Sequence, residues 1–236
     1  MCDNSFRKTL RGALMKILYE DKSLMAVEKP ADVLSEPSEK GEDVLTLASG
    51  QAGAPCFLVH RLDRNTGGAM VLAKNASMAG RLSEQIQKRE FVKEYLAVVK
   101  GVPEAPEGVF EDLLFKDSAR NKTFVVKRER KGVKKASLSY RVLSTVQNGE
   151  HGEVSLVLVR LNTGRTHQVR VQFASRKMPL LGDGKYGSRD NRCDTALWSF
   201  RLSFDHPATR EKIEVSCLPP KEYPWDLFCP EELVKG

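Results

Sequence analysis

The chain has 236 residues, of which 41% are hydrophobic, and carries a formal net charge of +7 at pH 7. No segment stays apolar over the about 20 residues that a membrane-spanning helix needs, and residues 1–8 lack the apolar core of a signal peptide. These features argue against integral membrane and secreted proteins, and we predict a cytoplasmic location with no membrane partner. A chain of this length can bury one substantial core, so we expect a single domain over residues 1–236.

Cysteine and histidine usage argues against metal and disulfide chemistry. The five cysteines are scattered and include no Cys-x-x-Cys pair, and the four histidines show no metal-ligand spacing. We therefore expect reduced thiols and no bound metal.

Short apolar segments, alternating or continuous, predict a chain rich in strands. In chain order, they lie at residues 14–19, 23–28, 56–59, 69–73, 91–99, 123–126, 136–142, 152–161, 197–204 and 212–217. The first two are expected to form a hairpin that ends at Pro30. The segments at 123–126 and 136–142 are expected to pair as a ribbon with a charged tip at Lys131 and Gly132.

Helical patterns are fewer. Residues 42–48 predict a short helix, and Asn75 is placed to cap a second helix that ends near Arg89. Residues 166–173 are ambiguous from the residues alone. Their apolar positions fit a strand, but they also fit a helix capped by Thr166.

A charged loop at residues 60–68, His-Arg-Leu-Asp-Arg-Asn-Thr-Gly-Gly, falls between the strands at 56–59 and 69–73. Its carboxylate, Asp63, is flanked by Arg61 and Arg64, and neighbouring cations keep such a group ionised by lowering its pKa by about 1 to 3 units. An ionised carboxylate can attack an electrophilic carbon, including the anomeric carbon of a sugar. Composition alone favours the alternative of a solvated turn in which the aspartate pairs with an arginine.

The positive charge is concentrated in one block. Residues 116–135 contain nine basic and two acidic side chains, an excess that equals the net charge of the whole chain. Such a block suits a phosphate backbone, with Phe115 and Phe124 as stacking surfaces. A solvated hairpin that uses charge to prevent edge-to-edge aggregation explains the block equally well.

Three other enzyme classes are poorly supported. Residues 182–187 match Gly-x-Gly-x-x-Gly, but no amphipathic helix follows, so we reject a dinucleotide site. A kinase would need a glycine-rich loop early in the chain and an Asp-Phe-Gly motif, and a serine hydrolase would need Gly-x-Ser-x-Gly; none of these occurs.

Several motifs together resemble one family. Residues 60–68 are similar to the His-Arg-Leu-Asp-Arg-Asp-Thr-Ser-Gly signature of the RluA-type pseudouridine synthases, with Asn65 and Gly67 in place of the usual Asp and Ser. Residues 161–171 resemble that family's other long motif. Residues 93–97 resemble a third motif, and residues 182–187 resemble its Gly-Asp-x-x-Tyr-Gly loop.

The resemblance implies an α+β fold with a mixed, mainly antiparallel central sheet, flanking helices and a central RNA-binding cleft. It favours the helix over the strand at 166–173. Some relatives carry a separate N-terminal RNA-binding module, which we do not expect in this sequence because few residues precede residue 14. The implied activity is isomerisation of uridine in structured rRNA or tRNA, without a cofactor and by a monomer. The competing expectation is an inactive RNA-binding protein or RNA chaperone of the same fold, which Asn65 and Gly67 leave open.

The resemblance also assigns roles to residues. Asp63 is expected to be the nucleophile or essential carboxylate, Arg165 to pair with it, and Tyr95 to cover the uridine. RNA contacts are expected from Arg61, which would fill the gap left by the extruded nucleotide, and from His60, Arg64 and Val169.

Overall fold

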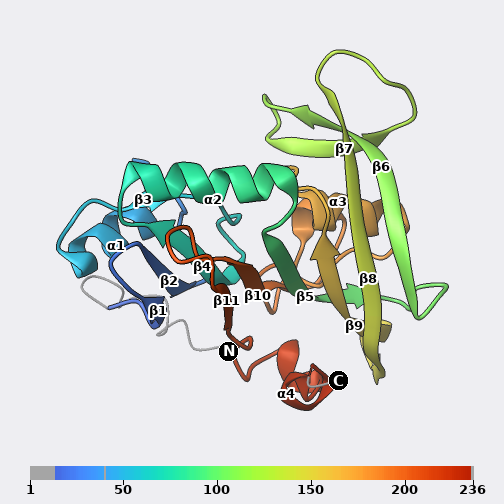
Figure 1. Cartoon of the computed structure of the whole chain (residues 1–236). Helices are drawn as coiled ribbons and strands as arrows, with labels where there is room; N and C mark the ends of the chain where they lie inside the picture. The colour runs from blue at the N-terminus through green and yellow to red at the C-terminus, as the bar shows by residue number, and fades with distance from the viewer. Residues whose placement is uncertain (1–13, 40, 235–236) are drawn as a thin grey trace.

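The computed structural model describes residues 14–39 and 41–234. Within these ranges, eleven strands form one sheet in the order β1-β2-β4-β10-β5-β9-β8-β6-β7, with β3 on β4 and β11 on β10 (Figure 1). The strands are β1 (Ile17–Glu20), β2 (Leu24–Lys29), β3 (Phe57–Leu58), β4 (Gly67–Ala73), β5 (Val92–Lys100), β6 (Glu107–Asp117), β7 (Lys122–Val126), β8 (Val133–Asn148), β9 (Gly152–Leu161), β10 (Leu197–Asp205) and β11 (Lys212–Ser216).

All the strand pairs are antiparallel except β4 with β10, which is parallel. The helices are α1 (Val44–Ala52), α2 (Ala76–Lys88), α3 (Gln168–Ser175) and α4 (Pro230–Leu233), with short 3₁₀ turns at η2 (Gly184–Tyr186) and η3 (Trp225–Leu227). The expected α+β class with a mixed, mainly antiparallel sheet is confirmed. No helix in the described ranges is both long and apolar enough to cross a bilayer, and the signal-peptide prediction for residues 1–8 falls outside those ranges.

The sheet carries a hydrophobic core on each face. Successive strand residues point to opposite faces, so on β5 Tyr95 and Ala97 join the core beneath α1 and α3, whereas Leu96 and Val98 join the core beneath α2. Figure 1 shows α2 running across one face of the sheet. Two cores built on one sheet fix α3 on the same face as Tyr95.

Local signals explain the helix boundaries. Asn75 Oδ1 accepts a hydrogen bond from the Met78 amide at 3.0 Å, and α2 ends at Arg89, which adopts a left-handed conformation with φ of 63°. The cap at Asn75 and a helix end near Arg89 were both predicted. The ambiguous segment is the helix α3, but the predicted cap is wrong: its N-cap is His167, not Thr166, and no side chain caps it.

The predicted ribbon between residues 123–126 and 136–142 is wrong. The strand β6 lies between β7 and β8 and pairs with both of them, Phe115 facing Phe124 on one side and Val133 on the other. The apolar residues of β6 are interrupted by charged ones, so its alternation is weak, and its partners are set by contacts distant in sequence. The segment around Gly132 is a turn that leads into β8, with the Val133 amide bonded to the Arg130 carbonyl at 3.0 Å.

Candidate active site

Asp63 lies in the loop between β3 and β4, on a turn closed by a 3.0 Å hydrogen bond from the Thr66 amide to the Asp63 carbonyl. The residue before it, Leu62, is buried and is held from both sides by Ser35, whose hydroxyl donates to the Leu62 carbonyl at 2.8 Å and accepts from its amide at 3.0 Å. With its neighbour anchored in this way, the Asp63 carboxylate stays at the surface, 28% exposed.

The two glycines that follow are required by close packing against β10. A Cβ atom on Gly67 would come within 2.3 Å of the Trp198 ring, and one on Gly68 within 2.3 Å of the Ser199 carbonyl oxygen. Gly68 also has φ of +112°, a conformation that other residues rarely adopt. Gly67 is one of the two departures from the family signature. The Trp198 ring occupies the position that a side chain at residue 67 would need.

A buried lysine holds the loop from below. The Nζ atom of Lys29, at the end of β2, donates to the carbonyls of Pro30 at 2.9 Å, Arg64 at 3.0 Å and Thr66 at 2.8 Å. Burial lowers the pKa of Lys29 to about 7, with Asp63 and Asp32 opposing the shift. Because an ammonium group has three N–H donors, its protonated form satisfies all three carbonyls. The sequence analysis missed this residue.

Arg170 on α3 contacts the catalytic loop. Its Nη1 atom lies 3.1 Å from Asp63 Oδ2, while Nε and Nη2 donate to the two oxygens of Asp183, each at 2.7 Å. Burial would lower the pKa of Arg170, but Asp183 and then Asp63 raise it above its ordinary value. The guanidinium is therefore a permanent cation, fixed by a buried bidentate partner and directed at Asp63.

The expected pairing of Arg165 with Asp63 is wrong in this structure. Arg165 is exposed and its Nε atom donates to the Lys135 carbonyl at 3.1 Å. It precedes α3, where its amide is bound by Gln168 Oε1 at 3.0 Å, whereas Arg170 lies within the helix, buried against the sheet. The same motif thus supplies the arginine, five residues later in the chain. The position of Arg170 next to the apolar Val169 on a predicted helix was the signal available in the sequence.

His167 and Tyr186 form a second link to Asp63. The Nε2 atom of His167 is 3.9 Å from Asp63 Oδ2, and its Nδ1 atom is 2.9 Å from the Tyr186 hydroxyl. That hydroxyl accepts a hydrogen bond from the Thr123 amide at 2.8 Å, which leaves its proton available for Nδ1. Burial lowers the pKa of His167 although Asp63 opposes the shift. This arrangement favours a neutral imidazole with its proton on Nε2, facing Asp63.

Tyr95 is brought next to Asp63 from β5. Burial, and then the charge of Asp63, raise the pKa of Tyr95 above its ordinary value, while a hydrogen bond with Ser199 opposes them. The phenol therefore stays protonated near neutral pH. Its covering of a uridine stays a prediction.

The residues expected to contact RNA separate into two groups. Arg61 and Arg64 are exposed, and they pair with Glu36 at 2.6 Å and Asp32 at 2.9 Å. By contrast, Val169 is buried in the core, and the Nε2 atom of His60 accepts a 3.1 Å hydrogen bond from the Val71 amide while its ring packs on Phe91.

The expectation of surface contacts is therefore corrected for His60 and Val169, which support the site from within. Burial lowers the pKa of His60 well below its ordinary value, so its ring is neutral. Across residues 14–39 and 41–234, no three His, Cys, Asp or Glu side chains are grouped so that they could hold a metal ion.

Comparison with known sequences gives one family. The model of the RNA pseudouridylate synthase family matches residues 23–175. The chain is 32% identical to ribosomal large subunit pseudouridine synthase D of Borreliella burgdorferi, over 80% of this chain and 60% of that protein. It is 33% identical to tRNA pseudouridine synthase C of Haemophilus ducreyi, over 86% of this chain and 90% of that protein.

Comparison with solved structures agrees. The human RNA pseudouridylate synthase domain containing 1 superposes with a TM-score of 0.75 at 25% identity, covering 92% of this chain and 88% of that one. The chain spans 60 to 67% of the length of the first four curated relatives that it matches.

Proposed function

This chain belongs to the RNA pseudouridylate synthase family, and we propose on that premise that it converts uridine to pseudouridine in RNA, with Asp63 as the essential carboxylate. The observation that carries the proposal is the contact of Asp63 with Arg170, itself fixed by buried Asp183, beside the ring of Tyr95. Three segments distant in sequence thus meet at one carboxylate.

The reaction breaks the bond between ribose C1′ and uracil N1 and joins C1′ to uracil C5. The C5 hydrogen is lost as a proton and N1 gains one, so no oxidant, reductant or cofactor is needed. Asp63 either bonds to C1′ or stabilises the cationic ribose, and the Arg170 contact at 3.1 Å holds its carboxylate in place for either role. Because its pKa is raised, Tyr95 suits stacking on the uracil and not proton removal.

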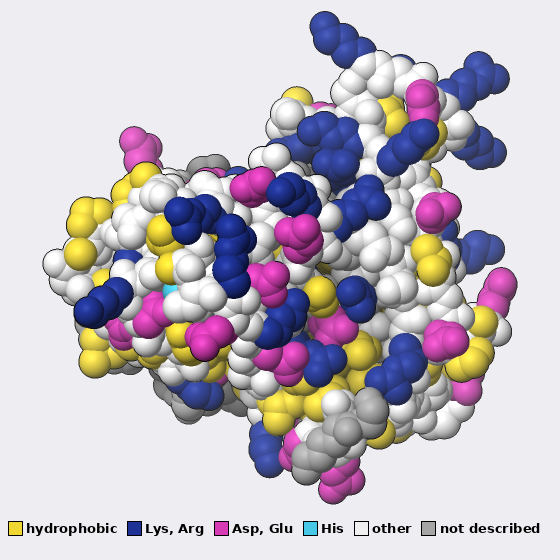
Figure 2. Space-filling view, viewed as in Figure 1, with side chains coloured by type: hydrophobic (Ala, Val, Ile, Leu, Met, Phe, Trp, Pro, Cys, Tyr) yellow, Lys and Arg dark blue, Asp and Glu magenta, His cyan; other side chains and the backbone are white. Residues whose placement is uncertain are grey.

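A uridine must leave its helix or loop to reach such a site, which costs a few kcal/mol and least in unpaired RNA. Figure 2 shows lysine and arginine side chains gathered on the projecting part of the molecule, where Figure 1 places β7 and the adjoining loop. These belong to the basic block of residues 116–135. We infer that this block holds the phosphate backbone while the uridine enters the site.

The substrate class is structured RNA, and relatives named for ribosomal RNA and for transfer RNA both match the chain. A monomeric state and a cytoplasmic location remain predictions. They depend on the sequence and not on the contacts described above.

Isotope release tests the activity. RNA transcribed with tritium at uridine C5 must lose the label when C5 joins the ribose, so the protein should release tritium from unmodified tRNA or rRNA transcripts. The variant Asp63→Asn keeps the shape of the side chain and removes its charge, so release should stop while RNA affinity persists. If the unaltered protein releases no label from either class of transcript, the inactive RNA-binding protein becomes the better explanation.

A further inference from the structure

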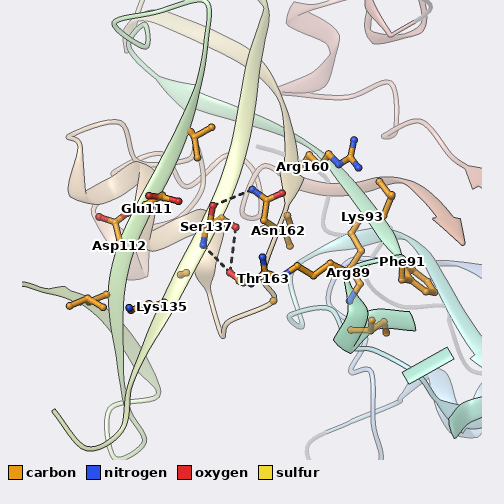
Figure 3. A pocket seen from close by; sticks show the side chains of 17 residues that line it. Arg89, Phe91, Lys93, Glu111, Asp112, Lys135, Ser137, Arg160, Asn162 and Thr163 are labelled. Atoms are coloured by element: carbon orange, nitrogen blue, oxygen red, sulfur yellow. Dashed lines mark hydrogen bonds between the residues drawn. The ribbon is translucent and has the colours of Figure 1, made fainter. Parts of the chain in front are cut away.

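A groove separate from Asp63 lies where α2 ends and β5 begins, and extends over β6, β8 and β9 (Figure 3). It has a volume of about 760 Å³. Neither Asp63 nor Tyr95 lines it, but Lys135 and three further cations do, namely Arg89, Lys93 and Arg160. We call it the basic groove.

The three further cations lack acidic partners. Within the part of the chain that the structure describes, no carboxylate forms an ion pair with Arg89, Lys93 or Arg160, whereas Lys135 lies 3.3 Å from Glu129. Lys93 is the most confined of them. Its Nζ atom lies 5.5 Å from the centre of the Phe91 ring, and burial lowers its pKa to about 8. An anion that entered the groove would offset the cost of confining this ammonium group.

Acidic residues occupy the other wall. Figure 3 shows Glu111 and Asp112 on β6, across the groove from Arg89 and Lys93. Asp112 is already satisfied by Arg176 at 2.9 Å and by Gln172 at 2.7 Å.

The floor between the two walls is neutral and polar. It is formed by Ser137, Asn162 and Thr163. The Ser137 amide donates to Thr163 Oγ1 at 2.9 Å, and Asn162 Nδ2 donates to the Ser137 hydroxyl at 3.1 Å. The positive wall is thus the one formed by the end of α2 and the start of β5, with Arg160 on β9.

Two segments join the basic groove to the candidate active site. Lys93 is two residues before Tyr95 on β5, but the register between β5 and β10 shifts between them. Lys93 pairs with Leu202 and lies over the Phe91 ring, on the side of the core beneath α2, whereas Tyr95 faces the core beneath α1 and α3. The floor residues Asn162 and Thr163 lead within a few residues to His167 and Arg170. Because Arg160 alternates with Val159 of the core beneath α1 and α3, the basic groove and the candidate active site lie close along the strands but on opposite faces of the sheet.

We propose that the basic groove binds the backbone phosphates of the RNA substrate, through Arg89, Lys93 and Arg160. The inference rests on the proposed function and adds the residues that set the position of the strand. These residues hold the RNA and do not touch the reacting atoms. They govern binding, and the chemical step belongs to the site around Asp63.

The test compares two triple variants of the full chain that lose the same charge. The groove variant is Arg89→Gln, Lys93→Gln and Arg160→Gln. The control is Lys16→Gln, Lys212→Gln and Lys221→Gln, whose lysines already pair with carboxylates elsewhere on the molecule. Binding of unmodified tRNA and large-subunit rRNA transcripts is measured at several KCl concentrations.

The groove variant should reduce the slope of log affinity against log salt by about 2 to 3, because three phosphate contacts are lost, and this corresponds to binding roughly 100- to 1,000-fold weaker at 0.1 M salt. In tritium release, its KM should rise while kcat stays the same. The control should change neither quantity. Circular dichroism verifies folding, and the double variant Arg89→Gln, Arg160→Gln, which leaves Lys93 in place, replaces the triple if that fails to fold.

Equal slopes for the groove variant and the control would refute RNA binding in the basic groove. A fall in kcat at unchanged KM would refute it as well. The two proposals fail separately. If the unaltered protein releases no tritium, the proposed activity is refuted, whereas the salt slopes still report whether RNA occupies the groove.

Discussion

Replacing Arg170 by methionine tests the central geometry, because this guanidinium bridges Asp63 and Asp183. The Asp183 side chain is fully buried, so Arg170→Met leaves an unpaired buried carboxylate and should lower the free energy of unfolding by about 3 to 5 kcal/mol. A hydrogen bond to a charged group is worth about 1.5 to 3 kcal/mol, so loss of the contact to Asp63 should reduce kcat for tritium release roughly 10- to 150-fold.

A second substitution separates stability from activity. Adding Asp183→Asn to Arg170→Met removes the unpaired charge, so urea titration should show that much of the lost stability returns. Tritium release should stay low, because Asp63 still lacks its cation. Recovery of both properties together would mean that Arg170 matters only for folding.

Arg165→Met is the matched control, since Arg165 is exposed and bonds only a carbonyl among the described contacts. We expect its stability to stay within about 0.5 kcal/mol of the unaltered protein, and its kcat to be nearly unchanged. Loss of tritium release in Arg165→Met, with activity retained in Arg170→Met, would refute the reasoning and restore the assignment made from the motif.

Two further predictions concern the scaffold of the loop. Lys29→Met leaves three carbonyls without their donor, and urea titration should show a loss of about 2 to 5 kcal/mol in the free energy of unfolding. Lys16→Met removes an exposed ion pair and should lower the same quantity by less than about 0.5 kcal/mol. Since the pKa of Lys29 is lowered from 10.5 to about 7, the unfolded chain binds this proton between those pH values and the native chain does not. Its contribution to stability should therefore rise with pH from 7 to 10.5, and Lys29→Met should abolish that rise. In Gly68→Ala the new methyl group meets the Ser199 carbonyl, so the free energy of unfolding should fall by about 2 to 4 kcal/mol. Gly80→Ala places its methyl group in open space on α2 and should instead raise that free energy by up to about 1 kcal/mol. Equal effects of the two substitutions would contradict the packing argument.

The elements that the sequence predicted well are those whose signals are local. The cap at Asn75 and the continuous apolar residues of β5 and β9 depend on neighbours in the chain, and each element lies where it was expected. The strand β6 was missed, and with it the order of β7 and β8, because strand order depends on pairing between distant segments.

The site shows the same division. Asp63 lies within one continuous motif and could be found by reading it. Arg170, Asp183 and Lys29 reach the site from three other segments, and a list of residues does not show which arginine of a motif turns inward. The placement of Arg165 was wrong for this reason. The direction in which α3 leaves the loop decides which arginine meets the Asp63 carboxylate, and nearness to Gly164 in the sequence does not.

The clamp of Lys29 on backbone oxygens has an evolutionary consequence. Because the ammonium group bonds the carbonyls of Arg64 and Thr66 and not their side chains, the path of the loop is independent of which residues occupy positions 64 and 65. The side-chain amide of Asn65 makes a long 3.5 Å contact with Asp194, and Lys29 does not bind this residue. Selection can thus alter these outward positions to suit different RNAs while the geometry of the carboxylate is inherited intact.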